Sequence, residues 1–264
     1  MVLSIPSPGD PFVFQFGSLQ PRWYGVLLAV AVAVAVWMTR RQLRRRGLDP
    51  ESVFPVAVCA VLLGLVGARI EHVATDWKPY SQIFVNAFWI WRGGLGIYGA
   101  VLGGMLGAWI GCRIARLPFW VLADCAAPGL LLAQAIGRVG NYMNQELYGH
   151  PSSLPWAIRI DHPLPPYLSG QAFQPTFLYE ALWDLAVLGV LLYFQRRTSG
   201  RLRPGTVFAL YAALYSLGRL WIETLRIDHT DHLYGQRVEF WVAAVVVGVA
   251  GSAFAWLWSR RPVS

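Results

Sequence analysis

The sequence predicts an all-α polytopic membrane protein with about seven transmembrane helices, and three features of the chain lead to this fold class. Hydrophobic residues make up 56% of its 264 residues and charged residues only 14%, a composition typical of integral membrane proteins. Seven apolar stretches are long enough to cross a hydrocarbon core of about 30 Å as helices. The chain shows no set of strands that could close a barrel, which is the other fold able to span a bilayer.

The seven predicted spans follow one another with mostly short connections. They lie at residues 23–39, 53–72, 93–114, 119–139, 176–194, 204–223 and 237–258. In the first span, residues 29–36 alternate Ala and Val, a period that would fit a strand, but the length of the apolar run favours a helix. We therefore treat residues 1–264 as a single integral membrane domain.

The distribution of basic residues predicts the orientation of these spans. Thirteen of the 22 basic residues follow spans one, three, five and seven: Arg40, Arg41, Arg44, Arg45, Arg46, Arg113, Arg116, Arg196, Arg197, Arg201, Arg203, Arg260 and Arg261. Cytoplasmic loops carry such an excess, so the N-terminus is expected outside and the C-terminus in the cytoplasm. Basic runs between apolar stretches report topology, and we expect no nucleic-acid partner.

With this orientation, the polar residues of the spans gather at their outer ends. Span four ends outside at Arg138, and span six ends outside through Arg219, Glu223 and Arg226. An ionisable side chain within a membrane costs at least ~2.5 kcal/mol and marks a functional site by default. We therefore expect one site, facing the outer leaflet.

The outer connection between the fourth and fifth spans, residues 141–175, is long and rich in proline. A structureless loop of this length is uncommon in a compact protein. We expect a lid or a small outer head there, with a short strand within residues 156–160.

Two groups of polar residues predict an anion site at the outer ends. In the first, Arg138 is followed by Asn141, Asn144 and Glu146, which alone would also fit an arginine reaching to the membrane surface. In the second, Arg219, Glu223 and Arg226 are spaced by four and three residues, which places them on one helical face. Two arginines from different helices at one depth are suited to binding a phosphate.

Other motifs receive simpler interpretations. Gly99, Gly103, Gly107 and Gly111 recur every fourth residue, which indicates close helix packing, whereas Gly93 and Gly94 would let a backbone approach a substrate. Glu180, near the start of the fifth span, could pair with an arginine of the site. The acidic and histidine residues within 228–232 lack a further ligand close in sequence, so we expect no metal and no cofactor. No Ser or Cys stands beside a His as a nucleophile would, so the nucleophile is expected to come from a substrate.

These residues together resemble the prolipoprotein diacylglyceryl transferase family. Its signature, G-R-x-G-N-[aromatic]-x-N-x-E-x-[aromatic]-G, is met throughout residues 137–149. The resemblance extends to residues 22–25, 93–99, 174–181 and 219–226 and covers nearly the whole chain.

The resemblance implies an enzyme of the bacterial cytoplasmic (inner) membrane with its active site toward the outer leaflet. The family transfers the diacylglyceryl group of phosphatidylglycerol to the lipobox cysteine thiol of exported prolipoproteins, releasing glycerol phosphate. It implies that Arg138 binds phosphatidylglycerol and that Arg219 is essential to the chemistry. The expected headgroup pocket and its supports are Tyr24, Gly93, Gly94, Asn141, Asn144, Glu146, Gly149, Glu223 and Arg226.

One position departs from the family pattern, because Tyr98 stands where many members carry a histidine that is a candidate base. A tyrosine with a pKa near ~10 is a poor base at neutral pH. Either Tyr98 only orients the substrate, or nearby arginines lower the pKa of the thiol itself.

A seven-helix transporter or receptor for an anionic ligand is the competing function class. It predicts charged residues near the middle of the membrane and both an inner and an outer gate. An intramembrane protease would need a Ser/His pair, paired Asp or zinc ligands, and the spans contain none of these sets.

Overall fold

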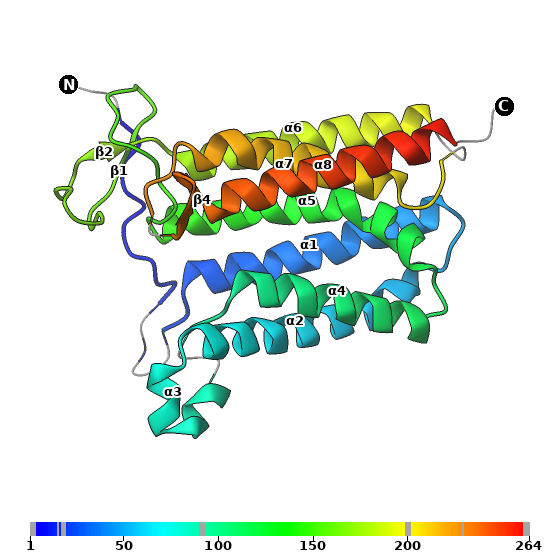
Figure 1. Cartoon of the computed structure of the whole chain (residues 1–264), viewed down its shortest axis with the longest axis horizontal. Helices are drawn as coiled ribbons and strands as arrows, with labels where there is room; N and C mark the ends of the chain where they lie inside the picture. The colour runs from blue at the N-terminus through cyan, green and yellow to red at the C-terminus, as the bar shows by residue number, and fades with distance from the viewer. Residues whose placement is uncertain are drawn as a thin grey trace. The chain divides into compact units, whose positions relative to one another are not determined.

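The computed structural model describes residues 4–14, 16, 20–89, 93–198, 202–228 and 230–260, with residues 82 and 84 described by their backbone alone. Long helices dominate these ranges (Figure 1). The chain forms two compact units, one of residues 1–38 with 126–264 and the other of residues 39–125.

Three helices of the first unit run side by side: α6 (Thr176–Arg197), α7 (Thr206–Glu223) and α8 (Val238–Ser259) (Figure 1). Most of α5 (Phe119–Met143) and the first part of α1 (Trp23–Arg45) belong to the same unit. Its core is apolar and joins α5, α6 and α7 through Ala127, Leu131, Val187, Leu191, Val207 and Tyr211. Burial of these side chains holds α5, α6 and α7 against one another, and the same three helices carry polar residues discussed below.

The segment between α5 and α6 is folded rather than structureless. Strand β1 (Ile158–Arg159) pairs antiparallel with β2 (Ala172–Phe173), and Ile5 bridges to Ile158. The predicted strand within residues 156–160 is therefore confirmed. Around this pair lies a small apolar core made of Tyr148, Ile158, Ile160, Phe173 and Phe177.

The second unit is organised around α2 (Val53–Thr75) and α4 (Ile97–Ile114), which pack closely. A Cβ atom added at Gly99, Gly103 or Gly107 would collide with backbone of α2. The glycines spaced by four therefore let two helix backbones approach, as the sequence indicated. The short helices η1 (Pro50–Ser52), α3 (Lys78–Gln82) and η2 (Phe84–Phe88) complete this unit.

Two helix boundaries differ from the predicted spans in ways that matter for the site. Helix α4 begins at Ile97 instead of residue 93, because Gly93 and Gly94 adopt positive φ angles of 87° and 78° that no right-handed helix allows. Helix α5 continues to Met143, beyond the predicted end at residue 139, so Asn141 lies within the helix instead of after it.

Within the described residues, six helical segments are long and apolar enough to cross a membrane: α1, residues 50–75, α4, α5, α6 and α8. The predicted helix over residues 204–223 is present as α7, but it is not among the six. Its charged residues Arg219 and Glu223 reduce its apolar character. A polytopic, mostly helical protein is thus observed, whereas the count of seven spans stays a prediction. Outside the helix pairs, large apolar side chains such as Leu62, Leu102 and Val245 are more than half exposed, as lipid-facing residues are.

Candidate active site

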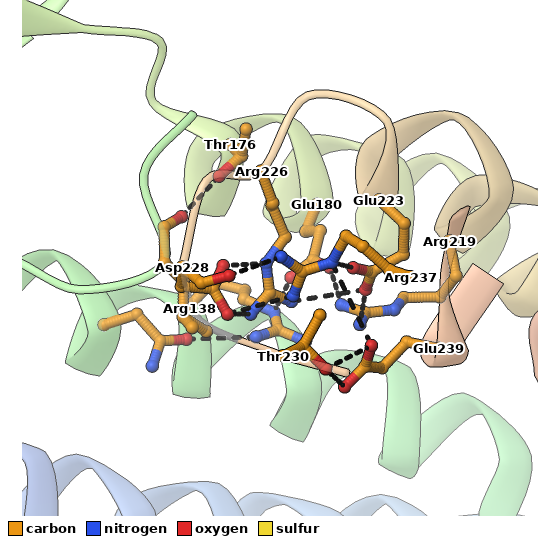
Figure 2. A network of polar contacts seen from close by, with 12 residues as sticks. Arg138, Thr176, Glu180, Arg219, Glu223, Arg226, Asp228, Thr230, Arg237 and Glu239 are labelled. Carbon is orange, nitrogen blue, oxygen red and sulfur yellow. Dashed lines mark hydrogen bonds and ion pairs between the residues drawn. The ribbon is translucent and has the colours of Figure 1, made fainter. Parts of the chain in front are cut away.

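A cluster of buried charges lies in the first unit, where the end of α5, the start of α6 and the end of α7 meet the segment that leads into α8 (Figure 2). Arginine and carboxylate side chains alternate through it. The structure brings together both groups of polar residues that the sequence placed in a site.

Arg138 of α5 and Arg219 of α7 converge on one carboxylate, that of Glu180 on α6 (Figure 2). Arg219 Nη1 donates a hydrogen bond to Glu180 Oε1. Arg138 Nε forms an ion pair with Glu180 Oε2, although its geometry does not meet that of a hydrogen bond. The two arginine side chains are each 16% exposed and that of Glu180 is 5% exposed, so the bridge is largely shielded from water.

Glu223 is the second shared carboxylate. Its Oε1 accepts from Arg219 Nη2 and from Arg226 Nη1, the latter at 3.3 Å, and its Oε2 accepts from Arg237 Nε at 2.8 Å. The Glu223 side chain is fully buried. Three guanidinium groups therefore surround this one buried carboxylate and offset the cost of burying its charge.

Asp228 binds two of the same arginines. Arg226 donates from Nε to Oδ1 and from Nη2 to Oδ2, at 2.8 and 2.9 Å, and Arg237 Nη2 donates to Oδ2 at 3.0 Å. Burial opposes ionisation of Asp228, but the hydrogen bonds and positive charges of Arg226 and Arg237 outweigh it and hold the pKa of this carboxyl below its usual value.

The signature residues cap the end of α5 next to this cluster. Arg138 Nη1 donates to Asn141 Oδ1 at 3.1 Å, and Asn141 Nδ2 donates to Glu146 Oε1 at 2.8 Å. Asn144 Nδ2 also reaches Glu146 Oε1, at 3.4 Å. A chain of contacts therefore runs from Arg138 to the acidic residue of the signature and fixes the orientation of the guanidinium.

Gly149 joins the signature to the other two helices of the site. Its N–H donates to the Gln174 carbonyl at 2.8 Å, and the next residue, His150, donates to the Leu225 carbonyl at 3.0 Å. A Cβ at Gly149 would lie 2.6 Å from the Leu225 carbonyl oxygen and 2.9 Å from Thr176 Cγ2. Only glycine allows the three segments to meet here.

Tyr24, near the start of α1, packs against Gly140 of α5. A Cβ added at Gly140 would lie 2.8 Å from Tyr24 Cδ2. The tyrosine ring thus lies against the helical turn that carries Arg138 and Asn141.

The remaining predicted residues, Gly93, Gly94 and Tyr98, lie in the second unit. Arg69 of α2 holds the two glycines through its Nη1, which donates to their carbonyl oxygens at 2.7 and 2.9 Å. The same guanidinium donates to the carbonyls of Ala87 and Asn86 and lies over the Tyr80 ring. Tyr98 is 43% exposed in the first turn of α4.

Sequence reasoning missed part of the cluster. The sequence did not single out Arg237, and the acidic residues within 228–232, which include Asp228, were weighed only as metal ligands. Where the chain is described, no group of three acidic, histidine or cysteine residues could hold a metal ion, and Asp228 binds arginines instead. Glu180 was named as a possible partner of an arginine, and the structure pairs it with two.

A further acidic residue, Asp184, lies one helical turn beyond Glu180 on α6. It is 1% exposed, and its Oδ2 has no hydrogen-bond partner among the described residues. As an ionisable residue inside a predicted span it met the same criterion as Arg138, but its position did not group it with the polar residues at the outer ends of the spans.

Comparisons with known proteins point to one family. The family model of prolipoprotein diacylglyceryl transferase matches residues 11–258. A phosphatidylglycerol–prolipoprotein diacylglyceryl transferase of Frankia alni is 48% identical over 98% of this chain and 68% of the relative. A Frankia casuarinae protein of the same name is 47% identical over the whole chain and 64% of the relative.

The relative from a Nostoc species, also of that name, is 41% identical over 97% of this chain and 91% of its own length. The chain thus spans about two thirds of the two Frankia relatives and nearly all of the Nostoc one. These names support the transferase interpretation and not the transporter or receptor that competed with it. Given a family model matched over almost the whole length and relatives above 40% identity, this chain belongs to the prolipoprotein diacylglyceryl transferase family.

Proposed function

We propose that this protein transfers the diacylglyceryl group of phosphatidylglycerol to the lipobox cysteine thiol of prolipoproteins, forming a thioether and releasing glycerol phosphate. The names of the relatives support this activity. The observation that carries the proposal for this chain is the convergence of Arg138 and Arg219, from two helices, on the two oxygens of one carboxylate.

That convergence has the geometry of an anion site. Glu180 offers one oxygen to each guanidinium, and a phosphodiester offers two non-bridging oxygens in the same way. The lipid phosphate would replace Glu180 between the arginines or bind beside it. Glu223 keeps Arg219 in place during this exchange, because Glu223 is itself held by Arg226 and Arg237, which take no part in the exchange.

In the reaction, the thiolate sulfur attacks the carbon of the diacylated glycerol that carries the phosphate ester, and the bond between that carbon and the phosphate oxygen breaks. The electron pair of that bond remains on the departing phosphate, which gains negative charge. Preorganised arginine donors in a shielded site stabilise charge that develops in this way. The thiol proton ends on solvent or on the released phosphate, whose second pKa is about 6.

The other signature residues receive supporting roles in this proposal. Asn141, Asn144, Glu146 and Gly149 shape the headgroup pocket, and Tyr24 supports the turn that carries Arg138. Arg226 orients Glu223. In the second unit, Gly93 and Gly94 would let the lipid or peptide approach the backbone, and Tyr98 would orient a substrate.

We further propose that the protein resides in the bacterial cytoplasmic membrane with the site toward the outer leaflet, and that residues 141–175 form an outer head. The thirteen basic residues that follow alternate spans support this orientation. A single cysteine introduced at Ser169, in a background without Cys59, Cys112 and Cys125, should react with a membrane-impermeant maleimide in intact cells. Labelling only after the cells are opened would reverse the topology.

The activity is tested by supplying the purified protein with phosphatidylglycerol vesicles and a lipobox peptide. We expect loss of the peptide thiol, a matching gain of diacylglyceryl mass on the peptide and release of glycerol phosphate in equal amount. Vesicles of phosphatidylcholine and a peptide with Ser in place of Cys serve as controls. Absence of glycerol phosphate with authentic substrates would contradict the proposal.

A further inference from the structure

Four side chains of the site form a closed ring of charges: Glu223, Arg226, Asp228 and Arg237 (Figure 2). Each arginine contacts both carboxylates, and each carboxylate contacts both arginines. Arg237 is 6% exposed, and the ring as a whole carries no net charge. Such a ring is stable when complete and strongly destabilised by the loss of one member.

One oxygen of the ring, Glu223 Oε1, connects it to Arg219 of the proposed phosphate site. Glu223 Oε1 contacts Arg219, while its Oε2 is held by Arg237 Nε at 2.8 Å. The position of Arg219 therefore depends on a carboxylate whose far oxygen is held by Arg237. Among the described residues, the Arg237 guanidinium contacts Glu223, Asp228 and Glu239, so its influence on Arg219 passes through Glu223.

Arg237 reaches the ring from a different part of the chain than the other site arginines. It ends strand β4 (Gln236–Arg237), which pairs with β3 (His232–Leu233), and it directly precedes α8. Its Nη1 also donates to the Asp228 carbonyl at 2.7 Å, so backbone as well as side-chain acceptors fix the guanidinium. Near it, the Thr230 hydroxyl donates to Glu239 at 2.7 Å, which fastens the two ends of the hairpin to each other.

We infer that Arg237 is a positioning residue for the transfer reaction: it holds Glu223 so that Glu223 keeps Arg219 directed at the lipid phosphate. This inference rests on the proposed function. It assigns a role in the reaction to a residue directly before α8, a segment outside the family signature. Arg219 is assigned to the charge that develops during transfer, and Arg138 to binding of the lipid. Loss of Arg237 is therefore expected to slow turnover much more than it weakens binding.

The test compares Arg237→Gln, Arg237→Lys and the unaltered protein by kcat and KM for phosphatidylglycerol, per folded molecule. A displacement of catalytic groups by about 1 Å costs on the order of 100-fold in rate, so we expect kcat of Arg237→Gln to fall about 10- to 100-fold. We expect its KM to change by less than about threefold. Arg237→Lys keeps the charge but cannot supply the same fork of donors, and it should recover part of kcat.

Arg46→Gln is the matched control. Arg46 pairs with the buried Asp124 at 3.7 Å in the second unit, so this variant, like Arg237→Gln with Glu223, removes an arginine from a buried carboxylate. We expect a lower unfolding temperature, as for Arg237→Gln, but an unchanged kcat per folded molecule.

Three results would overturn the inference. One is an unchanged kcat in Arg237→Gln, and another is a KM that rises as much as kcat falls, which would make Arg237 a lipid-binding residue. The third is failure of both Arg237 variants to fold, which would make it a residue of the fold alone. If the unaltered protein released no glycerol phosphate, that result would instead contradict the proposed function, and the inference would fall with it.

Discussion

Arg69 in the second unit and the site arginines Arg138 and Arg219 in the first are held by different kinds of acceptor. Arg69 in the second unit donates to four backbone carbonyls, those of Asn86, Ala87, Gly93 and Gly94. Arg138 and Arg219 in the first unit contact carboxylate side chains. Both arrangements place oxygen acceptors around a guanidinium, but only the second can exchange its acceptor for another anion.

The difference separates a structural arginine from one suited to binding. Backbone carbonyls are neutral and cannot leave without unfolding the segment that carries them, so Arg69 stabilises the connection before α4. A carboxylate on a side chain can rotate away when a phosphate arrives, and it carries the same sign of charge as the ligand. Arg69 is 7% exposed and the side chains of Arg138 and Arg219 are 16% exposed, so all three are largely shielded from water, and the kind of acceptor is what separates them.

The largest effect on activity is expected for Arg219→Gln. Loss of one donor to a developing charge costs about 100- to 1000-fold in kcat. The fold should tolerate the change, because Glu180 keeps Arg138 and Glu223 keeps Arg226 and Arg237. Turnover and unfolding temperature of the same preparation check this prediction, and a variant that unfolds instead would remove the contrast with Arg69.

Arg69→Gln should show the opposite pattern. Four carbonyls lose their charged donor, and hydrogen bonds to charged groups contribute about 1.5–3 kcal/mol each, so a loss of at least ~3 kcal/mol is expected. A lower unfolding temperature and faster proteolysis within residues 76–96 are the measurements. Unchanged proteolysis there would show that Arg69 does not hold this connection.

A smaller effect is expected from pH. The pKa of Asp228 is lowered in the folded protein, so its stabilising contribution is complete above the ordinary carboxyl pKa of about 3.9 and is lost as pH falls through the lower folded value. The unfolding temperature should therefore decrease below about pH 4. Asp228→Asn should lack this part of the acid dependence, and an identical decrease in both proteins would exclude Asp228 as its source.

The smallest effect is expected at Tyr98 of the second unit. If this residue only orients a substrate, Tyr98→Phe should lose much less than the ~100-fold that a general base contributes. Tyr98→His, which introduces the residue found in many family members, is the companion variant. A large loss in Tyr98→Phe that Tyr98→His restores would assign a proton-transfer role to this position.

Much of the fold was predictable because helix length and hydrophobicity are local properties. The glycines at 99, 103 and 107 indicated a close helix pair, and α2 packs against them. The start of α4 was wrong by four residues, since hydrophobicity cannot show that Gly93 and Gly94 have positive φ angles.

The site was partly predictable for the same reason. Arg219, Glu223 and Arg226 share a helical face or its continuation, so their spacing alone indicated that they would be neighbours. The sequence indicated only that Glu180 could pair with some arginine of the site. Nothing local identified it as the bridge between Arg138 and Arg219. Arg237 was missed because its partners, Glu223 and Asp228, precede it by fourteen and nine residues across a hairpin.

By itself the sequence determined that this protein is a bundle of apolar helices whose charged residues gather near the helix ends, since apolar length and the cost of burying charge act residue by residue. Tertiary structure alone decided which carboxylate each arginine meets. The physical reason is that α5, α6, α7 and the hairpin before α8 each contribute one or two side chains to the cluster, and only their packing brings those side chains within hydrogen-bonding distance.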